Sequence, residues 1–189
     1  MDTGARPAAL DRLLDEIAAC ERDARTLVDD LSEAQINWQP QPGRSWSIGQ
    51  CLDHLAKINA SYLDAFAVAV ARASAEGRGP FVSLHPGWMG RWFVRSLEPP
   101  PSLKAPARPQ FVPASTIGKA EAVEGFLASH APFRALVEAC AAVDTNRITA
   151  PNPLFPRITM TVSTALLVIP AHDRRHLWQA KKVKEKIDR

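Results

Sequence analysis

Apolar residues recur every three or four positions in four long segments of the chain, which is the spacing of amphipathic helices. These segments run from Pro7 to about Leu31, from Ile48 to Val70, from Val123 to Cys140 and from Val162 to Ile187. The run 157–161 is rich in Ile and Thr, but it is short and has no evident partner, so we do not expect a strand there. The pattern predicts an all-α protein whose four helices form a bundle.

Capping signals place the starts of three of these helices. Ser47 followed by Gln50 forms a capping box ahead of the second helix. The third helix is expected to start at Ser115 or Thr116, and the fourth at Thr161 or Ser163. Pro170 falls inside the fourth helix, where it removes one backbone hydrogen bond. It is either a kink that opens space beside His172 or a break that the neighbouring packing tolerates.

A long, proline-rich connection, at about residues 77–114, links the second and third helices. Its aromatic and basic piece, Trp88–Arg95, predicts one short helix. Connections of this length within a domain are usually functional or packed over the core. We expect an ordered crossover that covers one side of the bundle; a lid over a pocket and a peripheral membrane anchor are weaker alternatives.

The histidines are the residues with most chemical potential. His172 and His176 lie four apart on the apolar face of the fourth helix, so both rings project from one face and can hold one metal ion with a third ligand. His54, beside the apolar face of the second helix, can supply that ligand. Three neutral imidazoles would leave an open position, as in catalytic sites. Cys51 is the main competitor as a ligand, although it fits the core.

Two other histidines are interpreted as core residues with satisfied hydrogen bonds. His130 would point inward from the third helix, and His85 lies in the crossover.

Composition narrows the class of protein. The 189 residues are most simply one domain, 1–189, and a net charge of +3 without clustered basic residues argues against nucleic-acid binding. The three cysteines lie far apart, as is typical of reduced, buried thiols. The sequence shows neither a signal-peptide pattern nor an apolar stretch of membrane-spanning length. We therefore expect a cytoplasmic protein without membrane contact.

Two motifs resemble a known family. Trp46-Ser47 followed by His54-Leu55, together with His172-x-x-x-His176 and Gln179, is similar to the signature of the DinB/YfiT-like metalloenzymes. The resemblance covers nearly the whole chain. It implies an up-down-down-up bundle, zinc or nickel held by His54, His172 and His176, and a homodimer. This sequence has Leu177-Trp178 where Arg-Gly is common in the family, which leaves the ligands alone but alters their surroundings.

The family includes thiol-dependent enzymes, namely a mycothiol-dependent maleylpyruvate isomerase and bacillithiol S-transferases. The resemblance thus implies a metal-dependent enzyme that acts on a small-molecule substrate. A divalent metal at three histidines can activate water or a low-molecular-weight thiol, so hydrolysis and thiol transfer are both available. Asp53, Asp173 and Gln179 are the nearest candidates to orient the imidazoles. We find no catalytic group beyond the metal site.

The alternative hypothesis is a non-catalytic helical module for dimerisation or interaction, with vestigial or structural histidines. The broad apolar helix faces and the Trp88–Arg95 segment would serve that role equally well.

Overall fold

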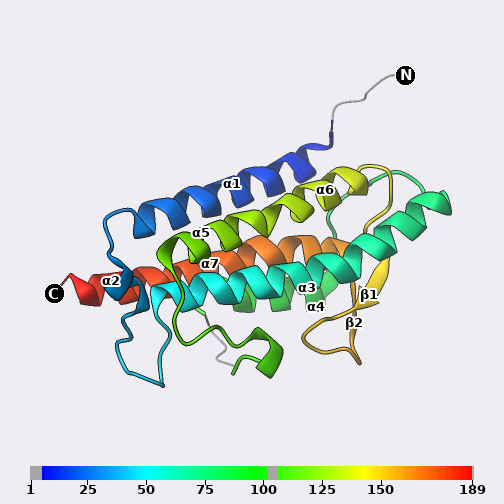
Figure 1. Ribbon diagram of the computed structural model, residues 1–189. Coiled ribbons are helices and arrows are strands. Elements are labelled where there is room, and N and C mark those ends of the chain that lie inside the picture. Colours follow the sequence, from blue (N-terminus) through cyan, green and yellow to red (C-terminus); the bar gives the residue numbers. More distant parts are fainter. Residues whose placement is uncertain (1–5, 102–105, 189) are drawn as a thin grey trace.

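The computed structural model describes residues 6–101 and 106–188. Four long helical segments run alongside one another in it (Figure 1). The segments are α1 (Ala8–Val28), α3 (Ile48–Ala75), the consecutive helices α5 (Lys119–Ala128) and α6 (His130–Cys140), and α7 (Val162–Ile187). α1 and α7 run in one direction, whereas α3 and α5–α6 run in the other. The predicted up-down-down-up four-helix bundle is confirmed.

The capping box predicted at Ser47 and Gln50 forms, and α2 (Glu33–Asn37) begins with a second one. At the start of α3, Gln50 N–H donates to Ser47 Oγ at 3.2 Å, and Ser47 N–H donates to Gln50 Oε1 at 3.1 Å. Ser32 and Gln35 make the same pair of bonds at α2. Each box satisfies two backbone donors that a helix start otherwise leaves without partners. The box at α3 fixes the beginning of the helix that carries His54.

The prediction of a single third helix capped by Ser115 or Thr116 was wrong. The helix begins instead at Lys119, behind Gly118, and it is interrupted between Ala128 and His130. Pro132 explains the interruption, because it has no N–H for the Ala128 carbonyl and its ring crowds that carbonyl. The two pieces nevertheless continue along the same side of the bundle (Figure 1).

The fourth helix starts at Thr161, one of the two predicted caps. The Thr161 hydroxyl accepts from Thr164 N–H at 3.2 Å. Pro170 lies inside α7 and is buried, and the helix continues through it to Ile187. A single helix therefore carries both His172 and His176.

The prediction that residues 157–161 form no strand was wrong. β1 (Thr149–Pro151) pairs antiparallel with β2 (Thr159–Thr161), with Thr149 opposite Thr161. The partner strand lies in the preceding loop, which folds back on itself just before α7. This hairpin adds a small sheet at one end of an otherwise helical protein.

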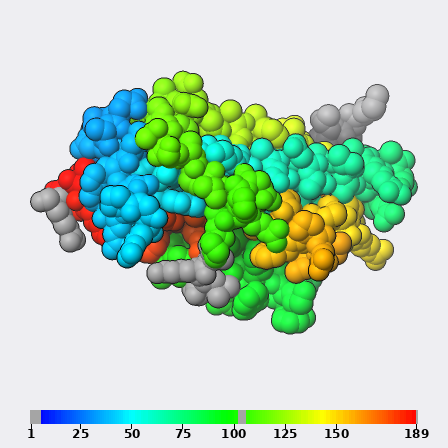
Figure 2. Space-filling model, turned by 60° about the horizontal axis from the view of Figure 1, so that its bottom comes forward, coloured from blue at the N-terminus to red at the C-terminus, as the bar shows by residue number. Residues whose placement is uncertain are grey.

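The crossover contains the predicted short helix, α4 (Gly87–Leu97), followed by the turn η1 (Pro109–Phe111). α4 packs against α7, and its Gly90 and Ser96 are buried. The crossover thus covers one side of the bundle, as expected. In Figure 2 the loop before α3, the end of the crossover and the hairpin lie side by side across this face. The interpretation of His85 as a core residue was wrong, because this side chain is exposed.

The core consists of two hydrophobic clusters arranged along the helices. One contains residues 48–55 of α3 and 177–183 of α7, and the other residues 58–73 and 162–169 of the same helices. All three cysteines are buried free thiols, as predicted. His54, Asn59, Asp173 and His176 are buried polar residues that belong to neither cluster. None of the helices in the described ranges has the length and apolar character needed to span a membrane.

Candidate metal centre

The bundle brings the three predicted histidines together. His54 comes from α3, and His172 and His176 lie one turn apart on α7. One ring nitrogen from each lies within 4.8 Å of the other two. The ring centroid of His54 lies 5.4 Å from that of His172 and 4.7 Å from that of His176. Side chains from two helices thus face one point inside the bundle.

Hydrogen bonds on the far sides of two rings fix which nitrogens face that point. His54 Nδ1 donates to the Phe111 carbonyl at 2.7 Å, and His176 Nδ1 faces Gln179 Oε1 at 3.1 Å. A neutral imidazole that donates from Nδ1 carries a lone pair on Nε2. His176 Nε2 lies 3.2 Å from His172 Nε2. Two nitrogens on a tetrahedral zinc ion are about 3.3 Å apart, given bonds of about 2.0–2.1 Å.

Burial keeps the three rings neutral. It lowers the pKa of His54, lowers that of His172 far below its ordinary value, and lowers that of His176 to about 3, because a charged ring would lose its hydration. The positive charge of Arg175 also lowers the pKa of each ring. Neutral imidazole is the form that binds metal ions, so burial favours ligation.

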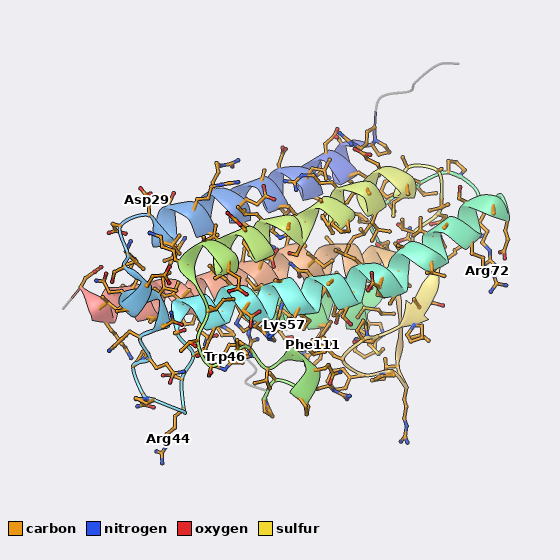
Figure 3. The ribbon with its side chains drawn as sticks, in the orientation of Figure 1. Asp29, Arg44, Trp46, Lys57, Arg72 and Phe111 are labelled. Carbon is orange, nitrogen blue, oxygen red and sulfur yellow. The ribbon has the colours of Figure 1, made fainter. Side chains whose placement is uncertain are left out.

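Trp46 packs against the histidine cluster. The sequence motif contains this residue but did not predict the contact. The Trp46 ring centroid lies 4.7 Å from that of His54 and 5.6 Å from that of His176, nearly parallel to the latter. Figure 3 shows Trp46 and Phe111 on the same side of α3, below the helix. The indole ring therefore shields two of the three imidazoles.

A cavity of about 480 Å³ opens onto the cluster. The three histidines and Trp46 line it together with side chains from α3, α4, the end of the crossover and α7. Most of the other lining residues are aliphatic or aromatic, and Arg108 and Arg175 are its charged residues. This volume is in the range of small-molecule sites. The histidines are thus accessible to a small ligand in the cavity, and His54 and His176 are themselves buried.

Of the three residues predicted to orient the imidazoles, the structure places only Gln179 against one. Asp53 accepts instead from Lys57 Nζ at 2.8 Å and from Ala114 N–H at 2.7 Å. Its Oδ2, which accepts both bonds, thereby holds the crossover against α3. The Phe111 carbonyl, which sequence reasoning missed, takes the orienting role at His54.

Asp173 also departs from its predicted role, because it belongs to a separate buried network. Its carboxylate accepts from His130 Nε2 at 2.9 Å and from Asn59 Nδ2 at 3.2 Å. His130 Nδ1 contacts Glu21 at 3.0 Å, and Glu21 accepts from Arg134. Burial lowers the pKa of His130, but the two carboxylates outweigh burial and raise it above its ordinary value. His130 is therefore the satisfied core residue that was predicted.

Cys51, the competing ligand, does not fit this site. Its side chain lies in the hydrophobic cluster with Leu52 and Leu55. Burial raises the pKa of its thiol to about 12, and metals bind the thiolate. The donor set that fits a divalent cation is therefore His54, His172 and His176: burial keeps all three rings neutral, and the rings of His54 and His176 are anchored through Nδ1.

Comparison with known proteins places the chain in a family. The family model of the DinB superfamily matches residues 16–180, which includes all three histidines. The chain belongs to the DinB superfamily. The matched range contains the motifs at Trp46–His54 and His172–Gln179. The first spans the cap and the start of α3, and the second lies within α7.

A solved structure has the same fold. It is YfiT from Bacillus subtilis, described as a probable metal-dependent hydrolase with an unusual four-helix bundle topology. The match has a TM-score of 0.62 at 13% sequence identity and covers 100% of this chain and 93% of YfiT. A search of curated proteins found no match. The similarity to YfiT establishes the bundle topology of this DinB protein.

Proposed function

We propose that this DinB protein is a metal-dependent enzyme that holds a divalent cation, zinc or nickel, on His54, His172 and His176. The observation that carries the proposal is the convergence of three neutral imidazoles, two of them anchored through Nδ1, at one end of a small-molecule cavity. YfiT, with the same fold, is described as a probable metal-dependent hydrolase. The cation would act as a Lewis acid that lowers the pKa of a water or thiol bound to it.

The protein's own residues prepare the site for that chemistry. The Phe111 carbonyl and Gln179 hold the rings of His54 and His176 with Nε2 toward the centre. Trp46 covers two of the rings, and the apolar cavity limits water around the reacting groups. No side chain in the described cavity wall forms a Ser-His-Asp set or a pair of carboxylates. We therefore propose either hydrolysis or transfer of a low-molecular-weight thiol as the reaction.

A thiol-binding measurement separates the two reactions. If the protein transfers a thiol, a low-molecular-weight thiol such as cysteine methyl ester should raise the melting temperature of the zinc-loaded protein only. At a hundredfold excess over its Kd, the thiol stabilises the state it binds by about 2.7 kcal/mol. Equal stabilisation of metal-free protein would contradict coordination of the thiol. Zinc-dependent hydrolysis of an ester, without stabilisation by thiol, would favour the hydrolase.

A non-catalytic interaction module is the second candidate function. Trp88, Met89 and Trp92 of α4 are mostly exposed, which is unusual for large apolar side chains. We propose that the protein forms a homodimer in either case. Light scattering of the wild type and of Trp88→Ser/Trp92→Ser tests whether α4 contributes, since a monomeric variant is expected if it does. Metal-independent dimerisation without any metal binding would favour the interaction module over the enzyme.

A further inference from the structure

Two arginines and the three histidines line the same cavity. Arg175 immediately precedes His176 on α7, and Arg108 lies in the crossover next to η1. Among the described residues that line the cavity, none carries a carboxylate. Every formal charge on this wall is therefore positive.

Arg175 links α7 to α4 at the cavity. Its Nη1 donates to the Ser96 carbonyl of α4 at 3.4 Å, and the side chain is partly buried. Its side chain lines the same cavity as all three imidazoles. Arg174, the preceding residue, is bonded instead to Glu16 and Glu98. The two consecutive arginines thus point to different surroundings: Arg174 toward α1 and the end of α4, and Arg175 into the wall of the cavity.

Arg108 contributes a second positive charge to the cavity. Its guanidinium carbon lies 5.2 Å from the centroid of the Phe155 ring, which also lines the cavity. This cation–π contact directs an exposed arginine along the cavity wall. A ligand in the cavity therefore lies beside a second positive charge on the wall that Phe155 forms.

The uncharged part of the cavity wall determines which kind of molecule can fill the cavity. It is formed mainly by aliphatic and aromatic side chains, among them Ile58, Phe93, Leu97, Leu154, Val168 and Ile169. Such a surface favours a hydrocarbon body, because each apolar group that enters it leaves water. The planar fork of a guanidinium matches the two oxygens of a carboxylate. A cavity with this wall and this charge is complementary to an apolar acid.

We propose that the cavity binds small carboxylic acids with an aliphatic or aromatic body, with the carboxylate on Arg175 and the body against the apolar wall. The inference rests on the proposed function in one respect, since it makes such acids the substrate class of the histidine site. The acid's reactive group then lies beside His54, His172 and His176. Amines of the same shape are excluded by charge.

Calorimetry with octanoate, octan-1-ol and octylamine tests the proposal, since the three probes share one alkyl chain. The purified full-length protein is titrated both zinc-loaded and after chelation, because a carboxylate can also bind a metal ion directly. Octanoate should bind both forms, and octylamine neither. Each methylene added from butanoate to octanoate should tighten binding about fourfold. Octan-1-ol should bind about tenfold or more weakly than octanoate, because it lacks the charged hydrogen bonds.

Substitutions identify the arginine responsible. Arg175→Met should weaken octanoate binding to the metal-free protein about tenfold or more, and Arg175→Lys should weaken it less, because it keeps the charge but not the fork. Arg95→Met is the matched control: Arg95 is exposed on α4 and does not line the cavity, so binding should be unchanged. Circular dichroism verifies that each variant is folded.

Other outcomes overturn the proposal. Octylamine or octan-1-ol binding as tightly as octanoate, or an Arg175→Met variant with unchanged affinity, would show that Arg175 does not select an acid. Octanoate binding only to the zinc-loaded protein, at the same strength in Arg175→Met, would place the carboxylate on the metal instead. Zinc stoichiometry, measured on the same samples, tests the proposed function separately. If the protein binds zinc but does not select octanoate, the proposed substrate class is wrong and the proposed metal centre stands.

Discussion

At the scale of single residues, the candidate centre depends on groups that are not ligands themselves. The Phe111 carbonyl can only accept a hydrogen bond, so it requires a proton on His54 Nδ1 and a lone pair on Nε2. Gln179 acts in the same way on His176 through its Oε1. These two contacts select the tautomer that presents Nε2 to the centre. The orientation of His54 and His176 is therefore set by the protein itself.

Gln179 offers the cleaner test of this orienting role, because it acts through a side chain. Gln179→Met removes the acceptor while keeping a side chain of similar length. We expect zinc affinity to fall by about tenfold to hundredfold, as for other groups that orient metal-bound histidines. Competition with a chromophoric chelator measures the change. Gln41→Met, in the exposed loop before α3, is the control and should bind zinc like the wild type. Unchanged affinity in Gln179→Met would contradict the orienting role.

The convergence of the three histidines could be predicted from the sequence better than the groups that support them. His172 and His176 could be predicted because spacing of four on an apolar face brings two rings together. Asp53 and Asp173 were chosen because they adjoin His54 and His172 in sequence. Successive helix residues, however, are rotated by about 100°, so their carboxylates contact other elements. The Phe111 carbonyl could not be predicted, because a backbone group has no sequence signature.

At the scale of elements, the cavity depends on how closely α4 approaches α7. A Cβ added at Gly90 would lie 2.7 Å from Thr164 Oγ1 of α7 and 2.8 Å from Pro86 Cβ. These distances are shorter than atoms tolerate, so only glycine allows this approach. Phe93 and Leu97 of the same helix form part of the cavity wall. The spacing at Gly90 therefore helps to set the shape of the cavity.

Two glycine substitutions test this close approach. Gly90→Ala should destabilise the protein by about 1–3 kcal/mol, because the added methyl group must displace α4 or Thr164. Gly125→Ala, inside α5, is the matched control: its nearest new contact would be 4.0 Å away. There alanine should be neutral or stabilise the helix by up to about 1 kcal/mol. Urea unfolding of both variants measures the difference. Equal effects at the two positions would show that α4 is not held against α7 at Gly90.

The elements that were mispredicted depend on features that periodicity does not capture. The apolar spacing of the third segment continues across residues 128–130, but Pro132 interrupts the backbone hydrogen bonds there. The β1–β2 hairpin consists of strands of three residues each, and its pairing joins segments that local patterns treat as loop. The long helices were predictable because each repeats one pattern over several turns.

At the scale of the whole molecule, buried histidines couple stability to pH. The pKa of His54, His172 and His176 is lowered in the folded protein, so each contributes stability above its unfolded pKa that is lost as pH falls. The pKa of His130 is raised, so its contribution is present at low pH and is lost as pH rises through its folded pKa. The three lowered groups outnumber the raised one. We therefore expect the metal-free protein to lose stability as pH falls below about 6.5, the unfolded value.

The double variant His172→Asn/His176→Asn tests this account, since it removes two of the proton-binding groups. Between about pH 7.5 and 5.5, a range centred on the histidine pKa of unfolded chains, its stability should decline less steeply than that of the wild type. Urea unfolding at several pH values, with chelator present, measures the slopes. His85→Asn, at an exposed histidine, should retain the wild-type slope. Identical slopes in the double variant and the wild type would mean that the rings are not held neutral by burial.

Titration calorimetry of zinc into chelator-treated protein tests the central claim most directly. Wild type should bind one zinc ion per chain, because three imidazole nitrogens within 4.8 Å of one another form one site. His85→Ala should behave identically, since that histidine is exposed in the crossover. His54→Ala and His172→Ala should each lose the stoichiometric site, although the ligands come from different helices. Wild-type protein that binds neither zinc nor nickel, or variants that bind zinc as the wild type does, would contradict a three-histidine metal centre.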